Sequence, residues 1–306
     1  MSGLGRILIL GATGQVGREL QRSFAGAGEL FLSDTEMADV RSPESLRDAV
    51  RRAAPDVILN AAAYTAVDRA ETEPDDAFAI NAAAPRVLAE EAVRSNALLV
   101  HYSTDYVFDG SKPEPWEETD TPNPLNVYGA SKLAGERAVQ ETGGKYLIFR
   151  TSWVYGPHGN NFLLTMLRLG RERDQLRIVD DQIGAPTTSI ELADATRSIV
   201  TGALNRQFGP DESWIGLYHM SCAGFTSWCG FAREIFARGA SLLNGSLPEI
   251  IAIRSEEYLT AAKRPTNSVL SNKRLKSRFG VALPPWESAL SKTLVLLNGQ
   301  AASHTR

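Results

Sequence analysis

Short apolar runs alternate with helical periodicity in the first half of the chain. Five runs have the length and composition of strands: RILIL (6–10), ELFLSD (29–34), DVILNAAA (56–63), ALLVHYST (97–104) and KYLIFRTSWVYG (145–156). The segments between them carry apolar residues at helical spacing, and one opens with a Ser42 cap followed by Pro43. Repeated strand–helix units of this kind predict an α/β fold with a doubly wound, Rossmann-type parallel sheet.

The regularity weakens after about residue 155. Helices are expected near 160–172, 189–202 and 226–238, with shorter strands between them. We therefore expect a first domain over residues 1–155 and a smaller, interleaved α/β region over 156–306. Some segments of this second region should return to the first domain, and its tail, 298–306, is predicted to be disordered.

Composition narrows the class of protein. The chain has 306 residues, 43% hydrophobic and 22% charged, with a net charge of −4, which is ordinary for a globular protein with a sizeable core. No basic run suggests binding to nucleic acid, and no apolar run is long enough to cross a membrane. The N-terminus lacks a signal-peptide layout. Cys222 and Cys229 are interpreted as free thiols, which favours a cytoplasmic location.

Three glycines separate the first strand from the first helix. Gly11 permits a tight turn, Gly14 lets a pyrophosphate approach the backbone, and Gly17 lets the helix pack against the strand. A turn without a ligand could carry the same residues, but the strand before and the helix after favour a dinucleotide site. Cofactor contacts are expected from this loop and from the ends of the next two strands: Gly11, Thr13, Gly14, Gln15, Val16, Gly17, Asp34, Asp39, Val40, Ala62, Ala63 and Tyr64.

Asp34 ends the second predicted strand, where a carboxylate usually binds the adenosine ribose. Its charge would repel a 2′-phosphate and so favours NADH. Arg18, at the start of the first helix, could still reach that phosphate, which leaves NADPH open. The alternative role for Asp34 is to cap a turn.

Tyr128 and Lys132 lie four residues apart on a predicted helix and share one face. A nearby lysine cation lowers the pKa of a tyrosine, so the pair could act as a general acid toward a developing alkoxide. Taken alone, such a pair is more often a surface pair. Thr104 at the end of the fourth predicted strand favours the catalytic interpretation, because ligands bind at strand ends in open parallel sheets.

The glycine loop, Thr104, Tyr128 and Lys132 occur in the order and at the distances of the short-chain dehydrogenase/reductase superfamily, in particular its extended branch. GATGQVGREL, NAAAYTAVDRAE, HYSTDYVFDG, NPLNVYGASKLAGE, FRTSWVYG, NNF and DQIGAPT together resemble the dTDP-4-dehydrorhamnose reductase family. The resemblance covers nearly the whole chain. It implies NAD(P)H-dependent reduction of the 4-keto group of a dTDP-6-deoxy-L-hexose, which gives dTDP-L-rhamnose for cell-surface polysaccharide.

The resemblance also implies a set of substrate contacts. Trp153 would stack on the sugar, although it could instead be a core aromatic, and Arg264 would bind the diphosphate, although it could be a solvated surface residue. The residues implied around the nucleotide sugar are Thr65, Val67, Thr104, Asp105, Tyr106, Tyr128, Trp153, Asn161 and Arg264.

Some members of the family form homodimers around Mg²⁺ held by glutamates. The matching positions here are Glu19, Glu191 and Glu287, whose carboxylates suit Mg²⁺. Scattered glutamates in an acidic protein are more often solvated surface charges, so the sequence leaves both the metal and the homodimer open.

Two rival interpretations remain. One is a non-catalytic NADP-binding protein similar to the regulatory subunit of methionine adenosyltransferase, which would have no need of a complete Thr104, Tyr128 and Lys132 set. The other is a different nucleotide-sugar enzyme, an epimerase or a reductase of another deoxysugar. A dehydratase is disfavoured because the family of dehydratases carries Thr-Asp-Glu where this chain has Thr104, Asp105 and Tyr106.

Overall fold

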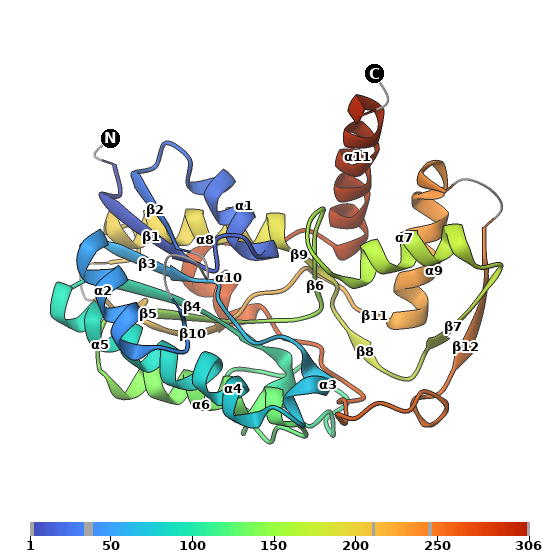
Figure 1. The fold of residues 1–306 in the computed structure, drawn as a ribbon, viewed down its shortest axis with the longest axis horizontal. Coiled ribbons are helices and arrows are strands. Elements are labelled where there is room, and N and C mark those ends of the chain that lie inside the picture. The colour runs from blue at the N-terminus through green and yellow to red at the C-terminus, as the bar shows by residue number, and fades with distance from the viewer. Residues whose placement is uncertain (1–2, 34–38, 210–211, 244–246, 305–306) are drawn as a thin grey trace.

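The computed structural model describes residues 3–33, 39–209, 212–243 and 247–304. Within them a six-stranded sheet has the order β10-β5-β4-β3-β1-β2 (Figure 1). Its strands are β1 (Arg6–Leu10), β2 (Glu29–Ser33), β3 (Val57–Asn60), β4 (Leu98–Thr104), β5 (Tyr146–Thr151) and β10 (Gly216–His219). Every neighbouring pair is parallel, which confirms the predicted doubly wound sheet.

The direction of winding reverses at β1. The chain moves from β1 to β2 on one side and to β3 on the other, so the switch point of the sheet lies between β1 and β3. In open α/β sheets ligands bind outside the carboxyl ends of the strands at this point. The topology therefore places the glycine loop, which follows β1, at the expected ligand position.

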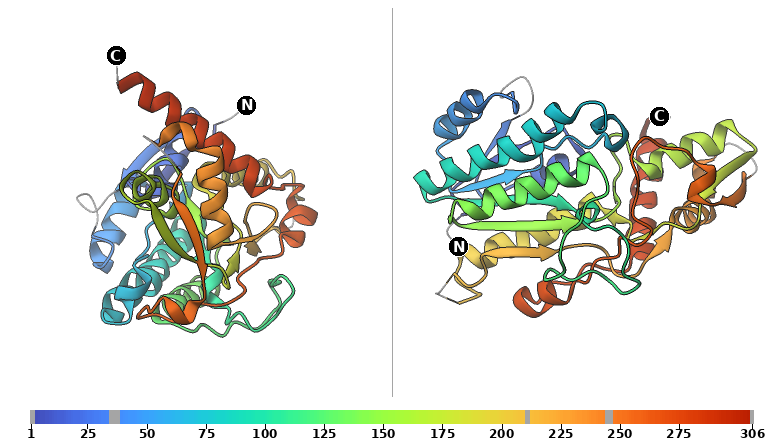
Figure 2. Two further views of the ribbon diagram at one scale, coloured as in Figure 1. Left: turned by 90° about the vertical axis from the view of Figure 1, so that its right-hand side faces the viewer. Right: turned by 90° about the horizontal axis from the view of Figure 1, so that it is seen from below.

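Helices cover both faces of the sheet (Figures 1 and 2). One face carries α1 (Gln15–Phe24) and α8 (Ser189–Leu204), and the other carries α2 (Pro43–Ala53), α5 (Ala84–Ser95) and α6 (Val127–Glu141). Alternation along β1 explains the two layers, since Ile7 and Ile9 join the first core and Leu8 and Leu10 join the second.

Sequence signals set the local boundaries of these helices. The hydroxyl of Ser42 accepts a hydrogen bond from the Ser45 N–H at 3.3 Å, and Pro43 occupies the first turn of α2, as predicted. Between β3 and α5 the chain forms α3 (Val67–Ala70), α4 (Pro74–Phe78) and the π-helical turn η1 (Ala79–Ala83), which packs against α6.

A smaller lobe stands beside the sheet, at the right of Figure 1. Its elements are α7 (Phe162–Glu172), β7 (Gln175–Val179), β8 (Ile183–Gly184), β11 (Thr226–Ser227), α9 (Trp228–Arg238), η3 (Ala240–Leu242), β12 (Glu249–Ile253) and η4 (Ser255–Glu257). Strands β7 and β12 pair in parallel, and β8 pairs antiparallel with β11. Two short strands, β6 (Val154–Tyr155) and β9 (Thr187–Thr188), also pair in parallel.

The second half of the chain contributes to both parts of the molecule. After β9 it returns to the sheet as α8 and β10 before it enters the smaller lobe again at β11. Later, α10 (Lys273–Phe279) packs against β10. A substrate bound between the two parts would therefore contact segments that lie far apart in the sequence.

The final helix, α11 (Trp286–His304), projects from the body of the molecule (Figures 1 and 2). It continues through residues 298–304, which the sequence predicts to be disordered. Gln300, Ala301 and Ala302 are good helix formers, so the helix continues past Gly299. None of the helices in the described ranges has the length and apolarity needed to cross a membrane.

Candidate active site

The glycine loop is a tight turn between β1 and α1. Gly11 has φ +69°, and a Cβ placed there would lie 2.6 Å from the backbone nitrogen of Ala62. A Cβ on Gly17 would collide with the carbonyl oxygen of Gly11. Both positions therefore require glycine, one for its backbone angle and one for close packing of helix against strand.

The N-terminus of α1 opens at this loop. Gly14 is its N-cap residue and provides no side-chain cap, so backbone N–H groups at Gln15 and Val16 are available to an anion. The Arg18 Nε donates to the carbonyl oxygen of Thr13 at 3.1 Å, which holds the guanidinium over the loop. The predicted phosphate-binding device is therefore present in its geometry.

The adenosine side of the candidate cofactor site is partly described. Asp34 lies outside the described residues. Asp39 is exposed. Hydrogen bonds from the Arg41 backbone N–H and, to a lesser extent, from the Arg41 side chain lower the pKa of the Asp39 carboxyl. Val40 and Ala62 both pack against the second core, beside the carboxyl ends of β1 and β3.

The segment after β3 is held by Asn81, a residue that sequence reasoning missed. Its amide oxygen accepts from the Tyr64 N–H at 2.9 Å, and its amide nitrogen donates to the Tyr64 carbonyl at 3.0 Å and to the Ser131 hydroxyl at 3.0 Å. Asn81 is fully buried and thereby ties the loop through Ala63 and Tyr64 to α6. An asparagine inside an alanine-rich helical pattern is the sequence signal that could have found it.

Helix α6 carries Tyr128 and Lys132. Asn126 caps it by accepting from the Gly129 N–H at 2.8 Å. Tyr128 lies beside Thr104 at the end of β4, and the Thr104 hydroxyl lowers the pKa of the Tyr128 phenol. The Lys132 side chain is buried, and its Nζ donates to the Tyr102 carbonyl at 2.6 Å. The three predicted catalytic residues are therefore brought together.

One expectation about this group is wrong for the structure. Burial raises the pKa of Tyr128 to about 12; the Thr104 hydrogen bond lowers it and the charge of Asp105 raises it further. Lys132, which was expected to lower that pKa, is directed to the Tyr102 carbonyl instead. Burial lowers the pKa of Lys132 to about 8, and Glu136 opposes that shift.

Asp105 and Tyr106 follow Thr104 in η2 (Asp105–Val107). The Asp105 carboxylate accepts from the Thr104 hydroxyl at 3.0 Å and from the Ser152 hydroxyl at 2.9 Å. Burial raises the pKa of Asp105 to about 6 despite these hydrogen bonds. The Tyr106 ring meets the Tyr128 ring edge to face, with centroids 6.0 Å apart.

Arg264 lies in a different segment but contacts the same region. Its guanidinium binds the Asp68 carboxylate through two hydrogen bonds of 2.7 and 3.1 Å. Asp68 follows Val67 at the start of α3, so the pair with Arg264 places Thr65, Val67 and Arg264 in neighbouring segments. Arg264 is largely buried rather than a solvated surface residue.

Trp153 takes part in an aromatic stack that the sequence did not predict. Its ring lies parallel to that of Trp228, with centroids 3.5 Å apart, and its φ of +46° is unusual for a residue with a side chain. Gly184 packs directly against the indole, which leaves no room there for a Cβ. Trp228 begins α9, so this stack joins β6 to the smaller lobe.

Asn161 has a structural role in this conformation. It caps α7 by accepting from the Leu164 N–H at 3.0 Å. Its amide nitrogen donates to Gln15 at 3.0 Å and to the carbonyls of Gly156 and His158. The implied substrate contact at Asn161 therefore competes with bonds that link the glycine loop to the smaller lobe.

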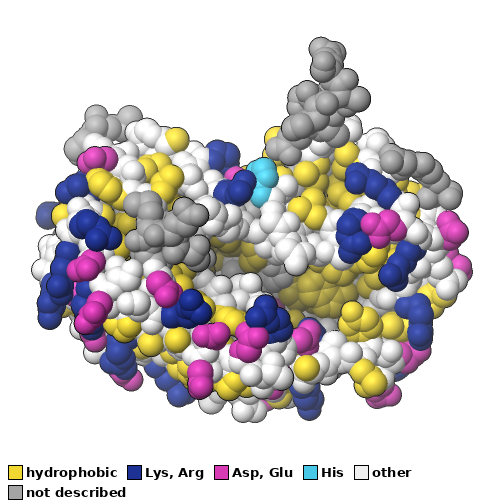
Figure 3. Space-filling view, viewed as in Figure 1, with side chains coloured by type: hydrophobic (Ala, Val, Ile, Leu, Met, Phe, Trp, Pro, Cys, Tyr) yellow, Lys and Arg dark blue, Asp and Glu magenta, His cyan; other side chains and the backbone are white. Residues whose placement is uncertain are grey.

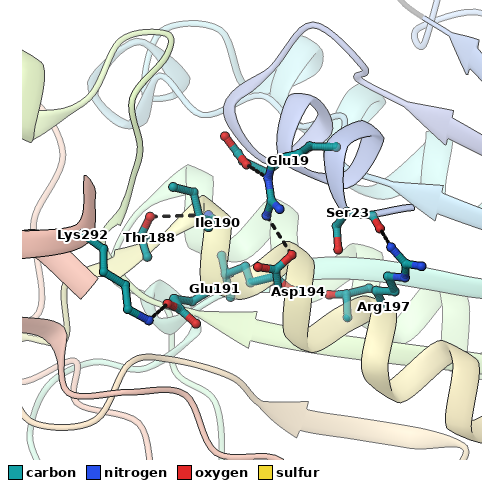
Figure 4. A network of polar contacts seen from close by, with 11 residues as sticks. Glu19, Ser23, Thr188, Ile190, Glu191, Asp194, Arg197 and Lys292 are labelled. Carbon is teal, nitrogen blue, oxygen red and sulfur yellow. Dashed lines mark hydrogen bonds and ion pairs between the residues drawn. The ribbon is translucent and has the colours of Figure 1, made fainter. Parts of the chain in front are cut away.

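The three glutamates considered for Mg²⁺ do not form a metal site in the described ranges, where no group of three or more suitable ligands occurs. Glu19 pairs with Arg22 at 2.7 Å, and Arg22 also binds Asp194 at 2.7 Å (Figure 4). Glu191 pairs with Lys292 at 3.1 Å. Glu19 and Glu191 thus have cationic partners, and Glu287 joins neither network.

The two parts of the molecule face each other across a hollow (Figure 3). Hydrophobic side chains line part of its wall on the side of the smaller lobe. A switch-point glycine loop, with a threonine, a tyrosine and a lysine at the end of a neighbouring strand, defines the class of dinucleotide-dependent oxidoreductases.

Comparisons with known proteins identify the family. The family model described as RmlD substrate binding domain matches residues 5–298. A dTDP-4-dehydrorhamnose reductase from Burkholderia thailandensis is 50% identical over 291 residues, which cover 93% of this chain and 96% of that protein. Another from Escherichia coli K12 is 46% identical over 294 residues, with 94% and 96% covered. The crystal structure of a dTDP-4-dehydrorhamnose reductase from Bacillus anthracis in complex with NADP has a TM-score of 0.87 at 37% identity, with 95% and 98% covered.

The chain belongs to the dTDP-4-dehydrorhamnose reductase family, and it is an NAD(P)H-dependent oxidoreductase. The family resemblance predicted from the sequence is confirmed.

Proposed function

We propose that this chain reduces the C4 keto group of dTDP-4-dehydro-β-L-rhamnose to give dTDP-β-L-rhamnose, a precursor of cell-surface polysaccharide. The observation that carries the proposal is the placement of Tyr128 on α6 beside Thr104 at the end of β4, with Lys132 buried one turn further along the helix. These are the groups that a simple ketone reduction needs from the protein.

Tyr128 is the proton donor. Because its pKa is about 12, the phenol is protonated at neutral pH and can give its proton to an alkoxide that forms at C4. The Thr104 hydroxyl, now donating to Asp105, can turn toward the ketone oxygen and stabilise the negative charge that develops there. A bound nicotinamide supplies the hydride.

The residues at α1 fit a dinucleotide cofactor. The tight approach at Gly11 and Gly17 and the uncapped helix start suit a pyrophosphate. Arg18, anchored on the Thr13 carbonyl, provides positive charge beside the loop for a 2′-phosphate. We therefore propose that the enzyme accepts NADPH as well as NADH, with NADPH favoured by Arg18.

The nucleotide sugar lies between the two parts of the molecule in this proposal. Trp153, held by its stack on Trp228, contributes an apolar indole to the sugar site in this proposal. Two hydrogen bonds to Asp68 hold the Arg264 guanidinium in place. When the substrate binds, the guanidinium releases the Asp68 carboxylate and binds the substrate diphosphate.

The rival functions fit the site less well. A non-catalytic NADP-binding subunit has no use for a Thr104–Tyr128 contact or for a lysine buried beneath it. A dehydratase needs a further acid and base, and Tyr106 occupies that position with a pKa raised by burial. An epimerase or a reductase of another deoxysugar would use the same catalytic residues, so substrate specificity separates those alternatives.

We also propose the cytoplasmic location expected from the sequence, and the homodimer stays open. Both cysteines are free and buried, which suits a reducing compartment. Light scattering on the purified protein measures the oligomeric state directly.

A direct assay tests the proposed activity. The protein is mixed with dTDP-4-dehydro-L-rhamnose, and the loss of reduced-cofactor absorbance is followed separately for NADPH and NADH. We expect turnover with both and a higher kcat/KM for NADPH. Turnover of other 4-keto nucleotide sugars at equal kcat/KM would contradict the substrate assignment, and no turnover with either cofactor would overturn the reductase proposal.

A further inference from the structure

A buried ion pair lies directly behind the catalytic group. The Arg150 guanidinium binds the Glu136 carboxylate through two hydrogen bonds, Nε to Oε1 at 2.8 Å and Nη2 to Oε2 at 2.6 Å. Both side chains are almost fully buried, at 4% and 1% exposed. The Ser103 hydroxyl also donates to Glu136, so the carboxylate has three donors.

The pair is connected to Lys132 by two routes. Glu136 follows Lys132 by one helical turn on α6, so the two side chains lie on the same face. Lys132 donates to the carbonyl of Tyr102, and the next residue of β4, Ser103, donates to Glu136. Ser103 and Arg150 are register partners on β4 and β5. A cation, an anion and a second cation therefore form a buried row under the site.

Such a row is not explained by stability alone. Removing two charges from water costs several kcal/mol per ion, and apolar replacements of buried ion pairs are often neutral or stabilising. One guanidinium nitrogen of Arg150, Nη1, also has no hydrogen-bond partner among the described residues. A stability role would favour an apolar pair here, so a function at the neighbouring lysine accounts better for the row.

We propose that Glu136, held in place by Arg150 and Ser103, is a positioning residue that keeps the Lys132 ammonium charged at its position behind the catalytic group, where it donates to the Tyr102 carbonyl. This inference rests on the proposed reductase function, in which we assign to Lys132 the role of binding the nicotinamide ribose. Glu136 touches neither substrate nor cofactor and acts through the lysine.

The other groups around this row do not replace Glu136. His101 on β4 stays neutral because burial and the charge of Lys132 lower its pKa, and burial lowers the pKa of His219 on β10 to about 3. Arg150 on β5 is a cation and cannot stabilise a second one. Glu118 accepts a hydrogen bond from the backbone N–H of His219 at 2.8 Å and makes no hydrogen bond or ion pair with Lys132 in the described residues.

The sign of the effect follows from these charges. Burial lowers the pKa of Lys132 to about 8, and Glu136 raises it. Removing the carboxylate charge lowers that pKa further, so the cation is lost at a lower pH. A variant with a neutral residue at position 136 should therefore be active at pH 6. As the pH rises, it should lose activity at a lower pH than the wild type does.

Glu136→Gln tests this directly, because the amide keeps the shape and can still accept from Ser103. We expect the alkaline limb of the kcat/KM profile to move down by about one pH unit, which is a loss of about fivefold at pH 8 that approaches about tenfold at higher pH, with near wild-type activity at pH 6. Glu141→Gln is the matched control, since Glu141 is on the same helix but pairs with Arg86 at the surface. An unmoved alkaline limb, or a loss that is equal at every pH, would overturn the inference.

A second variant covers the case in which an unpaired Arg150 prevents folding. The double variant Glu136→Gln with Arg150→Met removes both charges. The glutamine amide oxygen can still accept the hydrogen bond from Ser103. NADPH binding is then titrated by fluorescence from pH 6 to 9, which requires no turnover and so separates this inference from the reductase proposal. We expect NADPH affinity to fall at a lower pH than in the wild type; an identical pH dependence would contradict the role of Glu136.

Discussion

At the scale of single residues, the Thr104 hydroxyl links several residues of the site. It contacts Tyr128, donates to Asp105 and accepts from the Tyr106 N–H at 3.1 Å. A hydroxyl has a single proton, and in this structure the proton of Thr104 is donated to Asp105. Turning toward a substrate ketone therefore means giving up the bond to Asp105.

Thr104→Val should lower kcat by about a hundredfold, because the hydroxyl that stabilises the developing alkoxide is lost while the side-chain shape is kept. Thr104→Ser keeps the hydroxyl and should retain kcat within about fivefold. Steady-state kinetics on both variants measure this, and equal losses in the two would show that the methyl group, not the hydroxyl, is what matters.

Spacing, the position of Thr104 at a strand end and the family resemblance together predicted the catalytic group, but they did not predict its electrostatics. Tyr128, Lys132 and Thr104 were identified because strand ends and helix faces are local properties of the sequence. The raised pKa of Tyr128 arises from burial, which depends on distant segments. Asn81, Asp68 and Trp228 were missed for the same reason, since their partners lie far away in the chain.

At the scale of elements, the glycine loop fixes the distance between α1 and β1. Gly17 packs directly on the carbonyl of Gly11, which in turn packs against the backbone of Ala62 after β3. The loop therefore positions the start of α1 relative to two strands at once. This arrangement was predictable, because glycines at this spacing between a strand and a helix are typical of a dinucleotide-binding turn.

Gly17→Ala should push α1 away from β1 and weaken NADPH binding by about tenfold or more, because its Cβ would collide with the Gly11 carbonyl. Gly299→Ala on α11 is the control, since a Cβ there meets no atom within 4 Å and should stabilise the helix by about 0.5–1 kcal/mol. Fluorescence titration with NADPH and thermal melts give both quantities. Unchanged NADPH affinity in Gly17→Ala would contradict the packing argument.

At the scale of the whole molecule, the sequence predicted the sheet better than the smaller lobe. Apolar strands that are buried on both faces give a strong signal, whereas two-residue strands such as β8 and β11 give almost none. The ends of the sheet strands and the smaller lobe together form the hollow in Figure 3. Assembly of the substrate site therefore depends on the complete fold.

The free energy of unfolding should depend on pH through the ionisation of Asp105. Its pKa of about 6 in the folded state lies above the ordinary value of 3.8, so its contribution is fully present below about pH 4 and is lost as pH rises through 6. Asp105→Asn removes that dependence and should be more stable than the wild type at pH 8, by up to about 3 kcal/mol, with little difference at pH 4.

Thermal melts of Asp105→Asn and the wild type between pH 4 and 8 test this expectation. The exposed Asp48 on α2 provides the control Asp48→Asn, which should track the wild type at every pH. A difference between Asp105→Asn and the wild type that stays constant with pH would show that folding does not raise the pKa of Asp105.

The proton donor is the central claim, and Tyr128→Phe tests it most directly. The measurement is kcat for dTDP-4-dehydro-L-rhamnose at saturating NADPH, together with the NADPH dissociation constant. We predict a fall in kcat of about a hundredfold or more with an unchanged dissociation constant, because the ring remains and only the proton donor is lost. A kcat close to that of the wild type would contradict the assignment of Tyr128 as the proton donor.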